Sequence, residues 1–203
     1  MDIFLRAKHW QLFLLTFGIP FILQIVFMVN VFSHIQQSNN PGNIFEPFKY
    51  FIPVMIIFCG TLLGWQWSVA TGLQKMIPPG FGMNVTTFKV FLIIPVVYML
   101  CIFSLIGYVF SGNFLDNLQG SSVFIVFAVI FPLHLFCMFC LFYCIYFVAK
   151  TFKTAELQRP VSVSDYLGEF FLIWFFPIGV WIIQPKINQM LDRYNHATTE
   201  SLS

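Results

Sequence analysis

Charged side chains are scarce in this sequence, where Lys, Arg, Asp and Glu together make up only 9% of 203 residues. Soluble domains carry about 25% charged residues, and a chain this poor in charge cannot cover itself with a hydrated surface. The low charge therefore excludes an ordinary soluble protein. The net charge is +2 and no basic cluster occurs, so we expect no nucleic-acid partner.

Catalytic signatures are also missing. The sequence has no G-x-x-x-x-G-K-[ST] loop, no H-E-x-x-H motif, no G-x-S-x-G motif and no pair of aspartates inside an apolar run. A hydrolase needs a nucleophile with a base, or a held metal ion. The sequence therefore favours a protein that is not an enzyme, and it indicates no cofactor.

No cysteine lies in a loop, because all five fall within apolar runs: Cys59, Cys101, Cys137, Cys140 and Cys144. A disulfide framework places its cysteines where loops can be joined, so these residues indicate no oxidising compartment. The N-terminal apolar run is too long for a signal-peptide core and no A-x-A-like cleavage site follows it. We expect that run to stay in place as a first membrane span.

Long uncharged apolar runs are what the sequence does have, with 59% hydrophobic residues and a mean hydropathy of +0.83. Several runs exceed the roughly 18 residues that cross about 30 Å of hydrocarbon as a helix. The sequence predicts an all-α, polytopic, multi-pass membrane protein, built as one domain over 1–203 and surrounded by the lipid bilayer. We expect about five transmembrane helices, at about 10–32, 50–73, 88–111, 122–149 and 167–184. The composition resembles that of a small bacterial inner (cell) membrane protein.

The last apolar run, GEFFLIWFFPIGVWIIQPKIN over 168–188, leaves two topologies open. With the N-terminus in the cytoplasm, a crossing puts seven Lys and Arg residues inside and three outside, whereas a re-entrant dip puts nine inside and one outside. Length favours a crossing, because Leu167 to Gln184 reaches about 27 Å as a helix. Ser164 is a candidate N-cap, and Pro185 is expected to end the helix. We predict a fifth span.

After Pro185, apolar side chains recur at helical spacing in Ile187, Met190, Leu191 and Tyr194. This pattern predicts a short amphipathic helix lying on the membrane surface within 185–203, followed by a tail.

Small residues recur every four positions in the second span, at Gly60, Gly64, Ser68 and Gly72. Such a row lets a second helix backbone approach closely, which is the main source of association inside lipid. The spacing does not say whether the partner belongs to the same chain. Our first hypothesis is a non-enzymatic membrane subunit or accessory protein that associates through this face, as a homo-oligomer or with a membrane protein partner. The neighbouring Trp65, Trp67, Gln66 and Gln74 are read as interfacial.

Two ionisable residues define a candidate intramembrane polar site, His134 deep in the fourth span and Glu169 near the start of the fifth. Ionisable groups inside a membrane mark ion or proton paths by default, and one proline in each span could act as a hinge. The alternative hypothesis is therefore a small oligomeric transporter or channel. Glu169 can equally be a solvated first-turn carboxylate, or an acid that pairs with His134.

A third hypothesis is a metal- or haem-binding protein. His134, Cys137, Cys140 and Cys144 fall on one face of a helix, and imidazole and thiolate bind Zn or copper. Consecutive turns of one helix cannot close a tetrahedron alone, so these residues are weak metal candidates. The competing interpretation is that the thiols are small packing residues.

Overall fold

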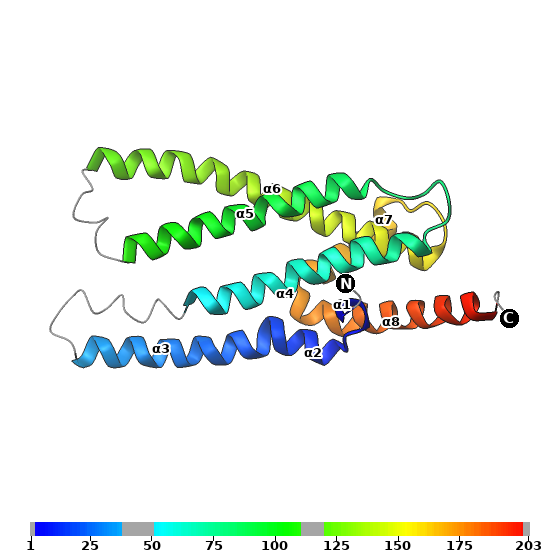
Figure 1. The fold of residues 1–203 in the computed structure, drawn as a ribbon, viewed down its shortest axis with the longest axis horizontal. Helices are drawn as coiled ribbons and strands as arrows, with labels where there is room; N and C mark the ends of the chain where they lie inside the picture. The colour runs from blue at the N-terminus through cyan, green and yellow to red at the C-terminus, as the bar shows by residue number, and fades with distance from the viewer. Residues whose placement is uncertain (1–2, 38–50, 111–119, 201–203) are drawn as a thin grey trace.

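The computed structural model describes residues 3–37, 51–110 and 120–200, and this part of the chain consists of helices and short connections, without a strand (Figure 1). Four helices are long and apolar enough to cross a membrane: His9–Ser33, Phe51–Met76, Val85–Gly107 and Phe127–Leu157. They coincide with the first four expected spans. The predicted all-α, polytopic fold class is therefore confirmed.

The first span is assembled from several helical pieces. A single turn, α1 (Ile3–Arg6), precedes α2 (His9–Phe13), a π-helical turn η1 (Leu14–Gly18) and α3 (Ile19–Gln37). Proline at position 20 has no N–H for the carbonyl of Thr16, so regular α-helical hydrogen bonding is interrupted there. The wider η1 turn directly precedes that proline, as π-bulges do where a helix ladder is disturbed.

The other three spans are long, nearly continuous helices. They are α4 (Phe51–Gly72), which is extended by the 3-10 turn η3 (Leu73–Met76), α5 (Val85–Phe110) and α6 (Gly120–Leu157). Both Pro95 in α5 and Pro132 in α6 lie inside their helices, as expected for membrane helices.

The buried core occupies one end of this bundle, the end where α4 and α6 finish and where α7 and α8 pack. Its largest fully buried side chains are Trp65, Phe88, Phe147 and Phe152, and Phe88 stacks on Phe147 with ring centroids 4.7 Å apart. Towards the opposite end the helices diverge (Figure 1), and large apolar side chains such as Phe127 and Val129 are exposed. We call the first region the packed half and the second the open half.

The last apolar run differs from the single span expected over 167–184, because it forms two helices, α7 (Val163–Trp174) and α8 (Phe176–Glu200). They meet at Phe175, whose φ of −89° and ψ of 55° are not helical. A side chain at Gly179 would overlap the backbone carbonyl of Leu172, so only glycine permits this close turn. Neither helix is among the candidate spans of the described residues.

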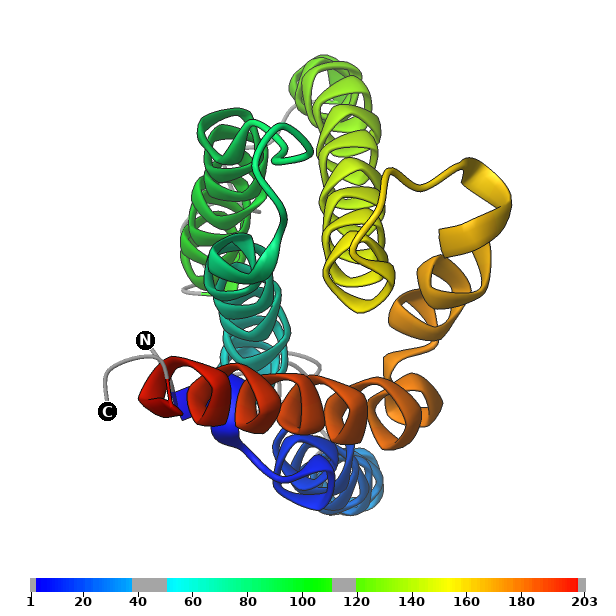
Figure 2. The ribbon, with the colours of Figure 1, turned by 90° about the vertical axis from the view of Figure 1, so that its right-hand side faces the viewer.

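The turn at Phe175 sends the chain back to where it came from. Figure 1 shows α7 leading away from the end of α6 and α8 returning, so that the C-terminus lies at the same end as the α4–α5 and α6–α7 connections. Viewed along the bundle, α8 lies obliquely across the other helices rather than beside them (Figure 2). This geometry is a helical hairpin, with its two outer ends at one end of the bundle.

Two local expectations for this region are wrong. The N-cap of α7 is Ser162, not Ser164, and Asp165 completes a capping box with it. Pro185 does not end a helix, because α8 continues through it. Buried neighbours on both sides, Ile183 and Ile187, hold α8 against the core and override the lost backbone hydrogen bond. The expected amphipathic helix therefore starts earlier, at Phe176.

Candidate functional site

The small-residue row of α4 receives the N-terminal turn of the same chain. A Cβ atom added at Gly64 would lie 2.9 Å from the ring of Phe4, and one added at Gly72 would overlap the side chain of Leu5. Leu5 is buried, as is Ser68 between the two glycines. At these positions α1 packs closely against α4, as the four-residue spacing of small residues indicates.

The seated turn is held by one amide, that of Gln184 in α8. Its Nε2 lies within hydrogen-bond distance of the carbonyl oxygens of Phe4, Leu5 and Ala7, at 3.2, 3.0 and 2.9 Å. Its Oε1 accepts a 2.8 Å hydrogen bond from Nε1 of Trp65. The two N–H groups of this amide, together with Nδ2 of Asn188 at 3.3 Å from the oxygen of Ala7, serve carbonyls that α1 and the residue after it leave without helical partners.

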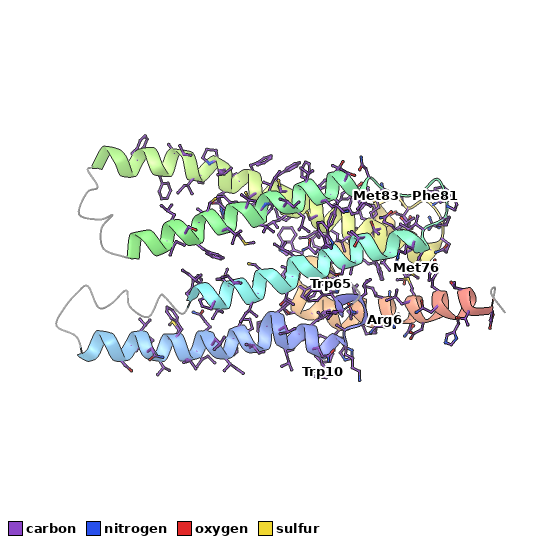
Figure 3. The ribbon with its side chains drawn as sticks, in the orientation of Figure 1. Arg6, Trp10, Trp65, Met76, Phe81 and Met83 are labelled. Carbon is purple, nitrogen blue, oxygen red and sulfur yellow. The ribbon has the colours of Figure 1, made fainter. Side chains whose placement is uncertain are left out.

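Trp65 was expected at the membrane interface, and the structure corrects this because its side chain is fully buried. Its ring meets Phe176 edge-on at 4.8 Å. Figure 3 shows Trp65 where α4 passes above the start of α8. The interfacial interpretation rested on distance along the helix, whereas burial comes from the returning hairpin, which covers α4 at this level.

Gln66 was also expected at the interface, but it is only 1% exposed and its Oε1 has no hydrogen-bond partner. Gln74 is partly buried and lies 3.4 Å from the hydroxyl of Thr151 on α6. An unpaired buried amide oxygen costs about 1–3 kcal/mol. Gln66 therefore carries an unsatisfied hydrogen-bond acceptor, which destabilises the packed half.

Gly60 is the member of the row that the chain leaves open. A Cβ atom there would meet nothing within 4 Å. The glycine lines an apolar cavity of about 310 Å³ between α4 and α5, whose walls include Ile56, Cys59, Val96 and Met99. Gly64 also lines this cavity, although Phe4 of α1 lies against it, so the row passes from an open position at Gly60 to a covered one at Gly72.

His134 lies on the exposed surface of α6, with its Nδ1 at 3.1 Å from the hydroxyl of Tyr98 on α5. Tyr98 is ten residues along α5 from Phe88, which stacks on Phe147 in the packed half. That distance is about 15 Å of helix, near the middle of about 30 Å of hydrocarbon. The pair is a polar contact between two candidate spans, and the intramembrane position of His134 stays a prediction.

Glu169 is buried and paired, so the interpretation as a solvated carboxylate is wrong. Its Oε1 lies 2.8 Å from Nζ of Lys153 on α6. The same ammonium lies 2.7 Å from Glu156, which in turn lies 3.2 Å from Lys186 on α8. This chain of four charges, which we call the ionic chain, joins α6, α7 and α8.

The structure does not bring Glu169 to His134. The partner of Glu169, Lys153, is 19 residues beyond His134 on α6, which is about 28 Å of helix. The two members of the predicted intramembrane polar site therefore belong to different places, one in the packed half and one in the open half.

The candidate metal ligands do not form a site. Cys137, Cys140 and Cys144 are buried and unpaired with one another, whereas His134 is exposed. The described residues contain no group of three or more His, Cys, Asp or Glu side chains able to hold a metal ion. The third hypothesis gains no support from this geometry.

The start of α7 is fixed by a second charged cluster outside the spans. The guanidinium of Arg159 forms two bonds to the carboxylate of Asp165, at 3.0 and 3.2 Å, and the backbone N–H and hydroxyl of Ser162 bond to the same carboxylate. The bonds from Arg159, followed by those from Ser162, lower the pKa of Asp165 to about 2. The first turn of α7 is thus locked to the connection from α6.

Sequence reasoning missed Gln184 and Lys153. Gln184 stands alone as an uncharged polar residue near the end of an apolar run, a position that could have marked it for a buried hydrogen bond. Lys153 was counted only as a topology signal.

Comparison with protein-family models, curated proteins and solved structures found no match to the chain.

Proposed function

We propose that the chain is a non-enzymatic integral membrane subunit or accessory protein, which associates with another transmembrane helix through the groove beside Gly60. The observation that carries this proposal is the division of the small-residue row. Gly72 is covered by Leu5 of α1, whereas Gly60 and Gly64 both line an apolar cavity of about 310 Å³, and Phe4 of α1 lies against Gly64 only. A helix from a second copy or from a partner protein would fill this cavity.

The physical argument is one of close packing. Lipid tails are as apolar as leucine side chains, so apolar character alone gives no preference for protein over lipid. A groove with glycine at its floor does favour protein over lipid, because a rigid helix gains more dispersion contacts there than a disordered acyl chain. Gly60 and the walls from α4 and α5 supply that shape.

We also place the chain in the cell membrane with its N-terminus in the cytoplasm. Of the ten Lys and Arg residues, nine belong to the terminal segments and the two connections at the packed end, while Lys49 lies outside the described residues. The positive-inside rule assigns that end to the cytoplasm. The hairpin of α7 and α8 brings the C-terminal positive charges to the same side (Figure 1).

The test uses Gly60→Leu, which fills the groove without meeting any side chain of its own chain at Cβ. The matched control is Gly107→Leu, since Gly107 lies in open space on α5 and does not line the groove. Gly64→Leu is unsuitable because it would displace Phe4. Cross-linking in native membranes, followed by mass spectrometry, should show a partner that Gly60→Leu loses and Gly107→Leu keeps.

Either identity of the cross-linked partner fits the proposal. A second copy would define a homo-oligomer, and a different membrane protein would define an accessory subunit. Undiminished cross-linking of Gly60→Leu, or no partner with the unmodified chain, would refute it.

The second candidate function is a small oligomeric transporter or channel, and the Tyr98–His134 pair is what favours it. The two residues lie just after Pro95 and Pro132, where each helix lacks a backbone hydrogen bond. Glu169 is no longer part of this path because Lys153 holds it. Proton flux into liposomes should be lost in His134→Ala if this candidate is right, and equal flux would dismiss it.

A further inference from the structure

Two cations from distant parts of the sequence line one small cavity in the packed half. Arg6 of α1 and Lys75 of η3 border a space of about 140 Å³, together with Tyr194 and Asn195 of α8. Leu5 and Leu191 form part of an apolar wall. Figure 3 shows Arg6 beside α8, below Met76, which closes the η3 turn.

Neither cation forms an ion pair with the residues that the structure describes. Within the described residues, the ion pairs of this end use Lys153, Arg159 and Lys186 as their cations, and none involves Arg6 or Lys75. No carboxylate lines the cavity. Two unpaired positive charges beside one small space repel each other, so an anion that contacts both is stabilised there.

The cavity lies at the level of lipid headgroups. Lys75 belongs to η3, the last turn of the span Phe51–Met76, so it stands where the hydrocarbon ends. The apolar wall meets the cationic side at the same place. Basic pockets between helices on the cytoplasmic side are the usual form of a phospholipid headgroup site.

We propose that this cavity binds a phosphate group, supplied by the headgroup of an anionic phospholipid or by a free phosphate. The Arg6 guanidinium can hold two phosphate oxygens with parallel N–H donors, and the Lys75 ammonium adds a point charge. The hydroxyl of Tyr194 and the amide of Asn195 supply uncharged donors. Gly72 lines the cavity beside Leu5, whose side chain lies against it.

The site also joins both ends of the chain. Its cations come from α1 and η3, and its uncharged donors come from the exposed last third of α8. A phosphate bound here would tie α8 to the membrane surface, where an amphipathic helix gains from anionic lipid.

The experiment measures thermal unfolding of the full chain, purified in neutral detergent and freed of lipid. Phosphatidylglycerol, phosphatidylcholine and inorganic phosphate are titrated separately, since a ligand of the folded state raises Tm increasingly as its concentration exceeds its Kd. The variant is Arg6→Gln with Lys75→Gln. The control is Lys8→Gln with Arg193→Gln, which removes the same charge from exposed residues that do not line the cavity.

We expect phosphatidylglycerol to raise Tm of the unmodified chain and of the control. The phosphatidylglycerol concentration needed for a given rise in Tm should be about tenfold higher or more in the variant, since two charge-assisted contacts are lost. An effect of phosphatidylglycerol alone identifies a lipid headgroup, and the same effect with inorganic phosphate identifies a free phosphate.

The proposal is overturned if phosphatidylglycerol raises Tm of the variant as much as Tm of the control. It is also overturned if phosphatidylcholine raises Tm as much as phosphatidylglycerol does, and by the same amount in the variant as in the unmodified chain. Lys75→Gln alone, at an exposed position, provides the same comparison should the double variant fold poorly.

Discussion

The indole Nε1 of Trp65 donates a 2.8 Å hydrogen bond to Oε1 of Gln184, so the second span and the C-terminal helix meet through a buried polar contact. The other end of the same amide bonds to carbonyls of residues 4, 5 and 7. One side chain therefore connects three segments that are far apart in the sequence.

Replacing that amide tests its importance. Gln184→Leu leaves the Trp65 N–H and the carbonyls of α1 without partners, which should cost about 1–3 kcal/mol for each group left unsatisfied. Trp65→Phe in the Gln184→Leu background removes the unpaired indole N–H. The loss of stability in the double variant should therefore be smaller than the sum of the losses in the two single variants. Thermal unfolding in detergent measures all four proteins, and strict additivity would contradict the contact.

The turn between α7 and α8 makes a second prediction. Gly179→Ala forces a Cβ against the carbonyl of Leu172 and should destabilise the protein by about 1–3 kcal/mol or more. Gly168→Ala, in open space on α7, should be neutral or slightly stabilising, since alanine favours a helix. Unfolding midpoints of the two variants compare them directly, and equal midpoints would show that the close approach is absent.

The ionic chain predicts an asymmetry between its two ends. Lys153→Met leaves Glu169 buried without a cation, which should cost about 3–5 kcal/mol. Glu169→Gln should cost less, because Lys153 keeps Glu156 as its partner. Arg159→Gln, from a pair whose arginine is 54% exposed, is the control and should cost least. The reverse order of the first two variants in thermal unfolding would rule out this arrangement.

Acid should loosen the first turn of α7. The pKa of Asp165 is lowered from 3.8 to about 2, so its stabilising contribution is complete above pH 3.8 and is lost as the pH falls through 2. Hydrogen exchange of the amides near Ser162 should accelerate in that window. Asp165→Asn should exchange fast already at neutral pH and lose this pH dependence; an unchanged pH profile in that variant would assign the effect to another group.

The hairpin predicts which side of the membrane carries the C-terminus. A cytoplasm-dependent reporter fused after Ser203 should be active, because α8 returns to the end that carries most positive charge (Figure 1). The same reporter inserted at Asn113, in the connection at the opposite end, should be inactive. An inactive fusion at Ser203 beside a correctly folded chain would restore the fifth crossing.

The four long spans could be predicted because each is an apolar run whose length alone sets its structure. The hairpin could not be predicted, because position 179 needs glycine only where the backbone of Leu172 lies against it, and that contact exists only in the folded turn. Pro185, which suggested a helix end, is overridden by burial on both sides of it.

The candidate site was predicted in part for the same reason. Four-residue spacing marked Gly64 and Gly72 as a packing face, but that spacing carries no information about which helix fills it. The occupant is α1, a single turn with no periodic pattern of its own. The membrane depth of His134 stays a prediction, and the partner of Glu169 could not be predicted because it depends on how α7 folds back onto α6.

The hydrogen bonds from Gln184 to residues 4, 5 and 7 also impose an order on the making of this protein. The turn α1 is synthesised before α8, because the amide that fixes it is 179 residues further along the chain from Leu5. Until α8 has been synthesised, the turn can rest on the glycines of α4 but lacks the amide of Gln184 as a partner for its carbonyls. A helix made later therefore fixes a turn made earlier, and a chain truncated before residue 184 would leave α1 loosely held.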